Sequence, residues 1–186
     1  MVPRMFFASL GLLAILFSST AALAEDAADY SREGPTLGLD GLYAIDTPSS
    51  SADFPNTGGL AVRIGFRMVP ELAVGIEGEW SDLGGRNPWS VSTLAKLYVL
   101  EFLDTNPLES VLGGRLQPFV VSSVGITAGH LGRGTQPAAT FRIGAGSDYW
   151  LSSDLALTGQ LVYVGNAGAA TDYSSVNLRL GVTWRY

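Results

Sequence analysis

The stretch that decides the fold is Ser174 to Tyr186, which reads SSVNLRLGVTWRY. Apolar residues alternate with polar ones throughout it. One face carries Val176, Leu178, Leu180, Val182, Trp184 and Tyr186, and the opposite face carries Ser175, Asn177, Arg179, Gly181, Thr183 and Arg185. This period of two predicts a β-strand with one apolar and one polar surface. Because the polar face includes two arginines, the strand needs an apolar medium on one side only.

Seven further segments upstream show the same alternation, separated by clusters of Gly, Pro, Asn, Asp and Ser. Each is about as long as the roughly 9 to 11 residues of a tilted strand that crosses a bilayer. We therefore predict an all-β fold, an eight-stranded antiparallel up-and-down transmembrane β-barrel with both chain ends on one side. The predicted strands are Thr36 to Asp46, Gly59 to Met68, Glu71 to Trp80, Ser90 to Phe102, Leu116 to Gly129, Ala138 to Leu151, Leu155 to Val164, and Ser174 to Tyr186.

The gaps between these segments alternate in length. Val69-Pro70-Glu71 and Ser152-Ser153-Asp154 are short enough for tight turns. Short turns at one end and longer loops at the other are typical of outer-membrane barrels. Only Leu103 to Arg115 departs from the pattern, as a long connection on the turn side. The longer gaps are Thr47 to Gly58, Ser81 to Trp89, His130 to Pro137 and Gly165 to Tyr173.

The first residues have the three parts of a secretory signal peptide. Arg4 supplies the positive charge, Met5 to Phe17 the apolar run, and Ala22-Leu23-Ala24 the cleavage site. The apolar run is shorter than the roughly 20 residues of a spanning helix, which favours cleavage over a membrane anchor. We expect residues 1–24 to be removed, residues 25–34 to form a loose polar segment leading into the barrel, and residues 35–186 to form the barrel domain.

Composition excludes several kinds of partner and site. The net charge is −6 and becomes −7 without the leader, whose one charged residue is Arg4, so an electrostatic grip on nucleic acid is not expected. The chain has no Cys, which excludes disulfides and thiolate metal sites. We expect neither a metal nor a cofactor.

Alternation alone does not say which face points outward, because a soluble barrel would place its apolar residues inside. The polar faces here are rich in Gly and mix both signs of charge. The interior of a small barrel is just wide enough for side chains, and a buried unpaired charge costs several kcal/mol. We therefore predict that the polar faces line the lumen and that their charges pair. The predicted network is Asp40, Arg63, Glu77, Glu79, Lys96, Arg142 and Arg179.

Aromatic residues fall near the strand ends on the apolar faces. Two girdles of Trp and Tyr at the membrane interfaces would account for this placement, whereas a soluble barrel gives no account of it. A general preference of aromatic residues for strands explains any one of them but not the set. The predicted loop-side girdle is Trp80, Tyr163 and Tyr173, and the predicted turn-side girdle is Phe66, Tyr149, Trp184 and Tyr186.

Four pieces of the chain resemble the OmpA-type outer-membrane barrel family. They are Arg67 to Trp80, Leu116 to Gly129, Gly144 to Tyr163 and the terminal LGVTWRY. The resemblance implies an eight-stranded barrel in the outer membrane of a Gram-negative bacterium, with both termini periplasmic. It also implies contact with outer-membrane lipids and lipopolysaccharide, help from periplasmic chaperones, and recognition of Val176 to Tyr186 by the barrel-assembly machinery.

Catalytic chemistry finds little support in the sequence. His130 is the one His, and it begins a Gly-rich loop without evident partners. Asn166-Ala167-Gly168 resembles the outer-membrane lipid A deacylases locally, but their His and Ser are missing from the positions just before that Asn, which hold Tyr163, Val164 and Gly165. We therefore expect no enzyme activity.

Three roles remain open at this point. The favoured one is a structural or interaction role in the cell envelope, with a lumen filled by paired charges. The alternative is a narrow passive pore for small solutes, in which the lumen charges exchange partners. An adhesin that acts through its external loops is the weakest, because it rests on the loops alone.

Overall fold

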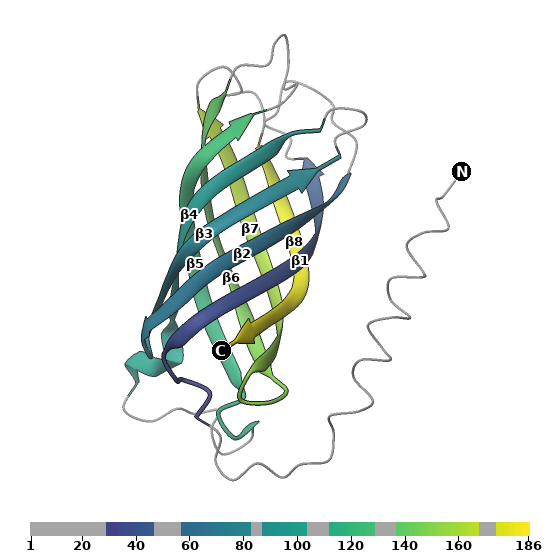
Figure 1. Ribbon diagram of the computed structural model, residues 1–186. Helices are drawn as coiled ribbons and strands as arrows, with labels where there is room; N and C mark the ends of the chain where they lie inside the picture. The colour runs from purple at the N-terminus through teal and green to yellow at the C-terminus, as the bar shows by residue number, and fades with distance from the viewer. Residues whose placement is uncertain (1–28, 47–56, 83–86, 104–111, 129–136, 168–173) are drawn as a thin grey trace, which may run out of the picture.

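The computed structural model describes residues 29–46, 57–82, 87–103, 112–128, 137–167 and 174–186. The expected signal peptide lies outside these residues. Eight strands form one closed barrel in which each strand pairs antiparallel with the next (Figure 1), so the predicted fold is confirmed. No helix among the described residues is long and apolar enough to span a bilayer. The elements are β1 (Gly34–Asp46), β2 (Thr57–Val69), β3 (Leu72–Ser81), β4 (Trp89–Tyr98), η1 (Val99–Phe102), β5 (Leu116–Ala128), β6 (Ala138–Trp150), β7 (Leu155–Ala167) and β8 (Ser174–Arg185).

The two terminal strands close the barrel. β1 and β8 pair along their whole length, from Thr36 opposite Arg185 to Asp46 opposite Ser175. Closure leaves no strand edge with unpaired backbone groups, which is what a sheet in lipid requires. The C-terminal stretch that suggested the fold is thus the closing strand, as predicted.

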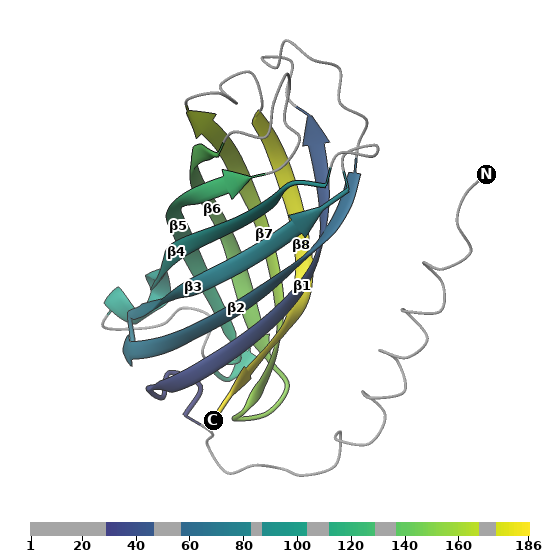
Figure 2. The same cartoon turned by 45° about the horizontal axis from the view of Figure 1, so that its top comes forward.

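The barrel has two different ends, visible in Figure 2. At the turn end lie the β2–β3 turn, the residues between β6 and β7, η1, the start of β1 and the end of β8. The four remaining connections join strands at the opposite end, which we call the loop end, and parts of them lie outside the described residues. The predicted alternation of connections is therefore confirmed.

The fourth strand is shorter than predicted. The prediction of a strand from Ser90 to Phe102 is wrong beyond Tyr98, because Val99–Phe102 form a 3₁₀ helix. β3 begins at Leu72, which lies opposite Leu97, and the Tyr98 amide donates to the carbonyl oxygen of Glu71 in the turn at 2.8 Å. No strand partner remains on that side for the residues that follow. β7, in contrast, continues to Ala167, where it still pairs with Ala139.

The outer wall is apolar and the lumen is polar. Large apolar side chains are exposed on every strand, and Leu180 in the middle of β8 is 64% exposed. Its neighbour Arg179 points into the lumen and is only 2% exposed. This is the reverse of a soluble barrel, so the medium around the wall must be apolar. The structure thus decides against a soluble barrel with its apolar residues inside.

Aromatic side chains lie on the outer wall near both ends. Trp80 faces Trp89 across β3 and β4 at the loop end, and Phe141 packs near Tyr163 with ring centroids 6.1 Å apart. The predicted girdle residue Tyr173 lies outside the described residues. The other six predicted girdle residues are exposed: Phe66, Trp80, Tyr149, Tyr163, Trp184 and Tyr186. Their role at a membrane interface stays a prediction.

Candidate functional site in the barrel lumen

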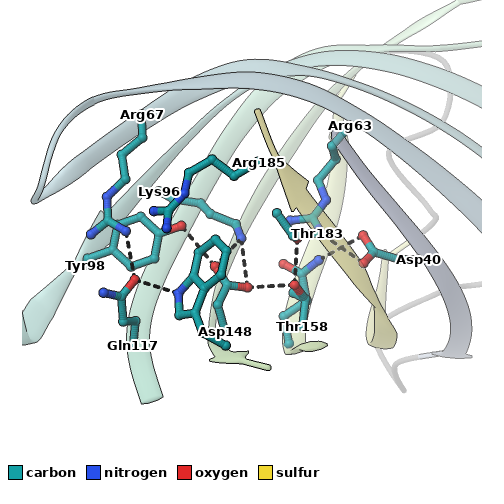
Figure 3. A network of polar contacts seen from close by, with 12 residues as sticks. Asp40, Arg63, Arg67, Lys96, Tyr98, Gln117, Asp148, Thr158, Thr183 and Arg185 are labelled. Carbon is teal, nitrogen blue, oxygen red and sulfur yellow. Dashed lines mark hydrogen bonds and ion pairs between the residues drawn. The ribbon is translucent and has the colours of Figure 1, made fainter. Parts of the chain in front are cut away.

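The candidate site is the charged interior of the barrel. Inward-facing side chains from all the strands fill it in layers that follow one another from the loop end to the turn end. Figure 3 shows the middle and turn-side parts of this network, which reach from Asp40 to Arg67. We describe the layers in that order because each has a different charge balance.

The loop-side layer joins three walls of the barrel. Glu77 and Glu79 alternate on β3, and Arg142 from β6 and Arg179 from β8 reach both of them. Arg179 Nη1 lies 2.8 Å from Glu77 Oε2, and its Nη2 contacts Glu79 Oε2. Arg142 lies 3.9 Å from Glu77 and 3.5 Å from Glu79. Two cations and two carboxylates therefore form one neutral, buried cluster.

Serine hydroxyls on β4 complete the loop-side layer. The Arg142 guanidinium donates to Ser92 Oγ at 2.8 Å and to Ser90 Oγ at 2.5 Å. These bonds place Arg142 against β4 and leave Arg179 the closer partner of both glutamates. The layer is thus asymmetric, with one tightly bound arginine and one more weakly bound.

The middle of the lumen holds an ion pair between neighbouring strands. Arg63 on β2 lies 2.8 Å from Asp40 on β1, and Gln160 on β7 donates to the same carboxylate at 3.5 Å. Glycines make room for this pair: a Cβ on Gly38 would lie 2.9 Å from Arg63 Nε, and one on Gly181 would overlap Asp40 Oδ1.

Below this pair, Asp148 on β6 is the centre of a hydrogen-bonded group. Lys96 Nζ lies 3.2 Å from its carboxylate, the Tyr98 hydroxyl donates to it at 2.9 Å and the Thr158 hydroxyl at 2.6 Å. The ammonium of Lys96 also lies 3.9 Å from the ring centroid of Phe119. Figure 3 shows Asp148 between Tyr98 and Thr158. The one cation and one anion again balance.

The turn-side layer contains two arginines but little negative charge. Arg67 on β2 donates to Gln117 Oε1 at 2.7 Å and lies 3.5 Å from Glu101. The indole of Trp150 donates to the same Gln117 oxygen at 3.0 Å, and the Arg185 guanidinium lies 4.1 Å from the Trp150 ring centroid. The remaining acceptors of the two arginines are backbone carbonyls.

The structure brings the seven predicted network residues into the lumen in three groups. Glu77, Glu79, Arg142 and Arg179 form the loop-side cluster, Asp40 pairs with Arg63, and Lys96 pairs with a residue that the predicted network omits. The omitted charged residues are Asp148, Arg67 and Arg185. All three share a polar strand face with predicted members or with other polar residues, so the alternation that placed the seven could have placed these as well.

Small hollows lie beside the lumen charges. Two hollows in the described part of the chain have volumes of about 30 and about 20 Å³ accessible to the centre of a water molecule. One water needs roughly 10 to 15 Å³ by this measure, so each hollow holds one or a few waters. The larger lies beside Arg63, Lys96 and Arg185, and the smaller lies beside Glu79, Arg142 and Asn166.

Of the residues considered for other chemistry, the structure describes Asn166 but not His130. Asn166 points into the lumen at the loop end and accepts a hydrogen bond from the Thr140 hydroxyl at 2.6 Å. His130 lies outside the described residues. Within the described ranges no three His, Asp or Glu side chains are grouped so that they could hold a metal ion.

Comparison with known proteins places the fold. No protein-family model matches the sequence, and no curated protein matches it. Among solved structures, Neisserial surface protein A (NspA) aligns with a TM-score of 0.64 and 15% identity over 83% of this chain and 99% of that chain. The Pseudomonas aeruginosa outer-membrane protein OprG aligns with a TM-score of 0.55 and 12% identity over 82% of this chain and 96% of that one. OprH from P. aeruginosa gives a TM-score of 0.53 and 15% identity over 82% and 99%.

At these identities the likeness concerns the fold. It agrees with the apolar outer wall, the polar lumen and the closed antiparallel sheet described above. The resemblance to OmpA-type barrels seen in the sequence is thus confirmed at the level of the fold. The chain is an eight-stranded antiparallel β-barrel with the OmpA-like fold.

Proposed function

We propose that this protein is a closed, non-conducting barrel with a structural or interaction role in the cell envelope. One observation carries the proposal: the lumen carboxylates Asp40, Glu77, Glu79 and Asp148 are all ion-paired, and the two hollows described above have room for only a few waters. A wall cross-linked from inside is rigid and keeps its two ends at a fixed distance. Such a wall is suited to presenting loops and to filling a bilayer, and it needs no catalytic group.

The proposed orientation puts the turn end in the periplasm and the loop end outside the cell. It is supported by the alternation of short and long connections and by the position of β1 and β8 termini at the same end. We propose that residues 1–24 are removed during export. Lipopolysaccharide and outer-membrane lipids would then surround the apolar wall, and β8 would be the strand that the assembly machinery recognises after periplasmic chaperones deliver the chain.

Three measurements test this proposal: gel mobility, conductance in a planar bilayer and sedimentation with outer membranes. Purified protein refolded into lipid should migrate differently on a denaturing gel before and after boiling, as a compact barrel does. In a planar bilayer the folded protein should give no current. Steady ion conductance by the unmodified barrel would contradict a closed lumen, and failure to sediment with outer membranes would contradict the location.

A narrow pore is the second candidate, and the asymmetric loop-side layer is the observation that favours it. Arg142 already lies within 4 Å of both glutamates that Arg179 binds, so an exchange of partners requires only small side-chain movements. Removing the shared carboxylate by Glu77→Ala would weaken the cluster. If the barrel can open, this variant should conduct while the unmodified protein stays closed; a silent variant would argue against gating. An adhesive role would rest on loop residues outside the described ranges and remains the weakest proposal.

A further inference from the structure

Residues 29–33, ahead of β1, contain a hydrogen-bonded turn. The Asp29 carboxylate accepts hydrogen bonds from the Ser31 amide at 3.0 Å and the Ser31 hydroxyl at 2.6 Å, and the Arg32 amide donates back to the Asp29 carbonyl at 3.4 Å. These bonds close a small turn of the kind that Asp side chains favour. The turn lies across the turn end of the barrel.

Tyr30 inserts into the lumen from this turn. Its side chain is only 7% exposed and packs in a cluster with Trp150 and Ala156, with its ring stacked on Trp150 at 6.4 Å between centroids. An aromatic ring from outside the sheet therefore fills the turn-side mouth. No periodic pattern in the sequence marks this residue, which follows a run of small and acidic residues.

The backbone of the same segment is bound by the two turn-side arginines. Arg67 Nη1 and Arg185 Nη1 both donate to the Tyr30 carbonyl oxygen, at 3.1 and 2.8 Å. Arg185 also donates to the carbonyls of Arg32 at 2.9 Å and Asp29 at 3.2 Å. Two guanidinium groups thus converge on one oxygen. Three carbonyls of the segment together occupy positions that anion oxygens would otherwise take.

This layer differs from the rest of the lumen in its charge. Elsewhere the buried cations match the buried carboxylates, whereas Arg185 forms no ion pair within the described residues. Among the described residues, Arg67 forms one ion pair, with Glu101 at 3.5 Å. Both guanidiniums also stack on aromatic rings, Arg67 on Tyr98 at 3.9 Å and Arg185 on Trp150 at 4.1 Å. Both rings belong to the barrel wall, Tyr98 to β4 and Trp150 to β6, and not to the segment.

We propose that Arg67 and Arg185 form an anion site at the turn-side mouth and that residues 29–33 are a built-in plug that occupies it. Planar guanidinium groups are suited to the oxygens of carboxylates and phosphates. While the plug is docked, the mouth is closed and the arginines bind backbone carbonyls. When the segment is withdrawn, the mouth opens and the site takes a small carboxylate or phosphate anion. The site is independent of the proposed closed lumen, because the charged layers above it remain in place.

The absence of Cys allows a direct test on the full-length chain in nanodiscs, which leave both ends of the barrel accessible. Ala156→Cys places a thiol under Tyr30, and thiosulfonate reagents of similar size and opposite charge measure its reactivity. Replacing residues 29–33 by five glycines removes the ring and the turn without shortening the chain. Ala44→Cys, buried at the loop end, is the matched control, and Thr183→Cys replaces Ala156→Cys if the latter does not fold.

The thiol at position 156 should be protected in the plugged chain and react at least about tenfold faster in the five-glycine chain. There the anionic reagent should also react about tenfold faster than the cationic one, because local positive potential raises the encounter rate of anions by that order. Arg67→Gln with Arg185→Gln should abolish this preference, and inorganic phosphate should slow the anionic reagent. The reactivity of the control thiol at position 44 should be the same in the plugged and the five-glycine chains.

Three results would overturn the proposal. Equal reactivity of position 156 with and without the plug, in barrels whose gel mobility shows them folded, would exclude a plug. Equal rates for the two reagents in the five-glycine chain would exclude an anion site. A response of position 44 as large as that of position 156 would mean that residues 29–33 stabilise the whole barrel and do not close one mouth of it, which also excludes a plug.

Discussion

Arg179 on β8 and Glu77 on β3 meet across the lumen at 2.8 Å, although neither strand neighbours the other in the sheet. Backbone hydrogen bonds connect each strand only to the next, whereas this pair connects walls that are otherwise separate. Glu77 is also within 3.9 Å of Arg142 on β6. One carboxylate therefore links three strands.

Glu77→Gln should destabilise the barrel by about 3 to 5 kcal/mol, the usual cost of leaving a buried charge without its partner. Urea unfolding in lipid vesicles, followed by tryptophan fluorescence, measures this change in the free energy of unfolding. Asp154→Asn is the matched control, because its ion pair with Arg32 is exposed and should be worth less than about 1 kcal/mol. Equal losses for the two variants would contradict a structural role of the network.

Lys96→Met should be more damaging than the double change Lys96→Met with Asp148→Leu. The single variant leaves the Asp148 carboxylate buried without a cation, whereas the double variant replaces both charges by apolar groups. The same unfolding measurement with all members of the double-mutant cycle gives the coupling. A double variant that loses the sum of the two single losses would mean that the pair contributes no interaction energy.

Gly181→Ala should destabilise the barrel by about 1 to 3 kcal/mol, the typical cost of an overpacked site. The new Cβ would overlap the Leu39 carbonyl oxygen and the Asp40 carboxylate, which holds Arg63. Gly78→Ala is the control on the outer wall, where a Cβ would meet nothing within 4 Å. We expect the control to unfold at the same urea concentration as the unmodified protein.

Leu180→Arg should cost about 2 to 4 kcal/mol, since this side chain lies near the middle of the outer wall, where the bilayer is most apolar. Ile45→Arg, near the loop end of β1, should cost about 0 to 1 kcal/mol because cost falls with distance from the midplane. Unfolding from lipid vesicles compares the two. Similar costs would mean that the membrane does not surround the wall as proposed.

Acid should release the plug. The two hydrogen bonds from Ser31, and to a lesser extent the nearby Arg185 and Arg67, hold the pKa of Asp29 below its ordinary value of 3.8. Because the turn favours the ionised form of Asp29, this carboxylate stabilises the turn fully at pH values above its ordinary pKa. The stabilisation is lost as the pH falls through the lowered pKa. A variant with Phe at the other Trp positions keeps Trp150, which packs against Tyr30, as its single Trp. Acrylamide quenching of its fluorescence should be constant above about pH 4 and should rise below it.

Asp29→Asn is the control for this pH dependence. It cannot titrate, so its quenching should lack the acid step that the Asp29 chain shows. An identical step in both chains would assign the acid effect to another group.

The direction of each strand side chain, toward the lumen or toward the outer wall, could be predicted from the sequence because it depends only on the two-residue period. Arg179 and Leu180 are adjacent and must point to opposite sides, and charge then decides which side is the lumen. Which side chains meet across the lumen depends on how the strands are staggered. The alternation of apolar and polar residues carries no information about this stagger. Lys96 meets Asp148 because of that stagger, and the predicted network therefore omits Asp148.

The docking of the plug at the turn-side mouth could not be predicted from the sequence for a different reason. Tyr30 lies in a short polar segment with no strand period, and its burial depends on a mouth built by residues more than a hundred positions later, such as Trp150 and Arg185. The position at which β4 ends could not be predicted either, because it depends on where β3 begins and not on the residues after Tyr98.

The pairing of β1 with β8 joins the two ends of the barrel domain, so the cylinder cannot be completed until its last strand is in place. Until then Arg179 and Glu77 are not paired, and the polar face of an unfinished sheet would expose unpaired charges to lipid. Such intermediates are penalised by the very groups that hold the finished barrel together. We therefore expect the lumen charges to favour the fully closed barrel over truncated or misregistered sheets, in which these charges would lack their partners.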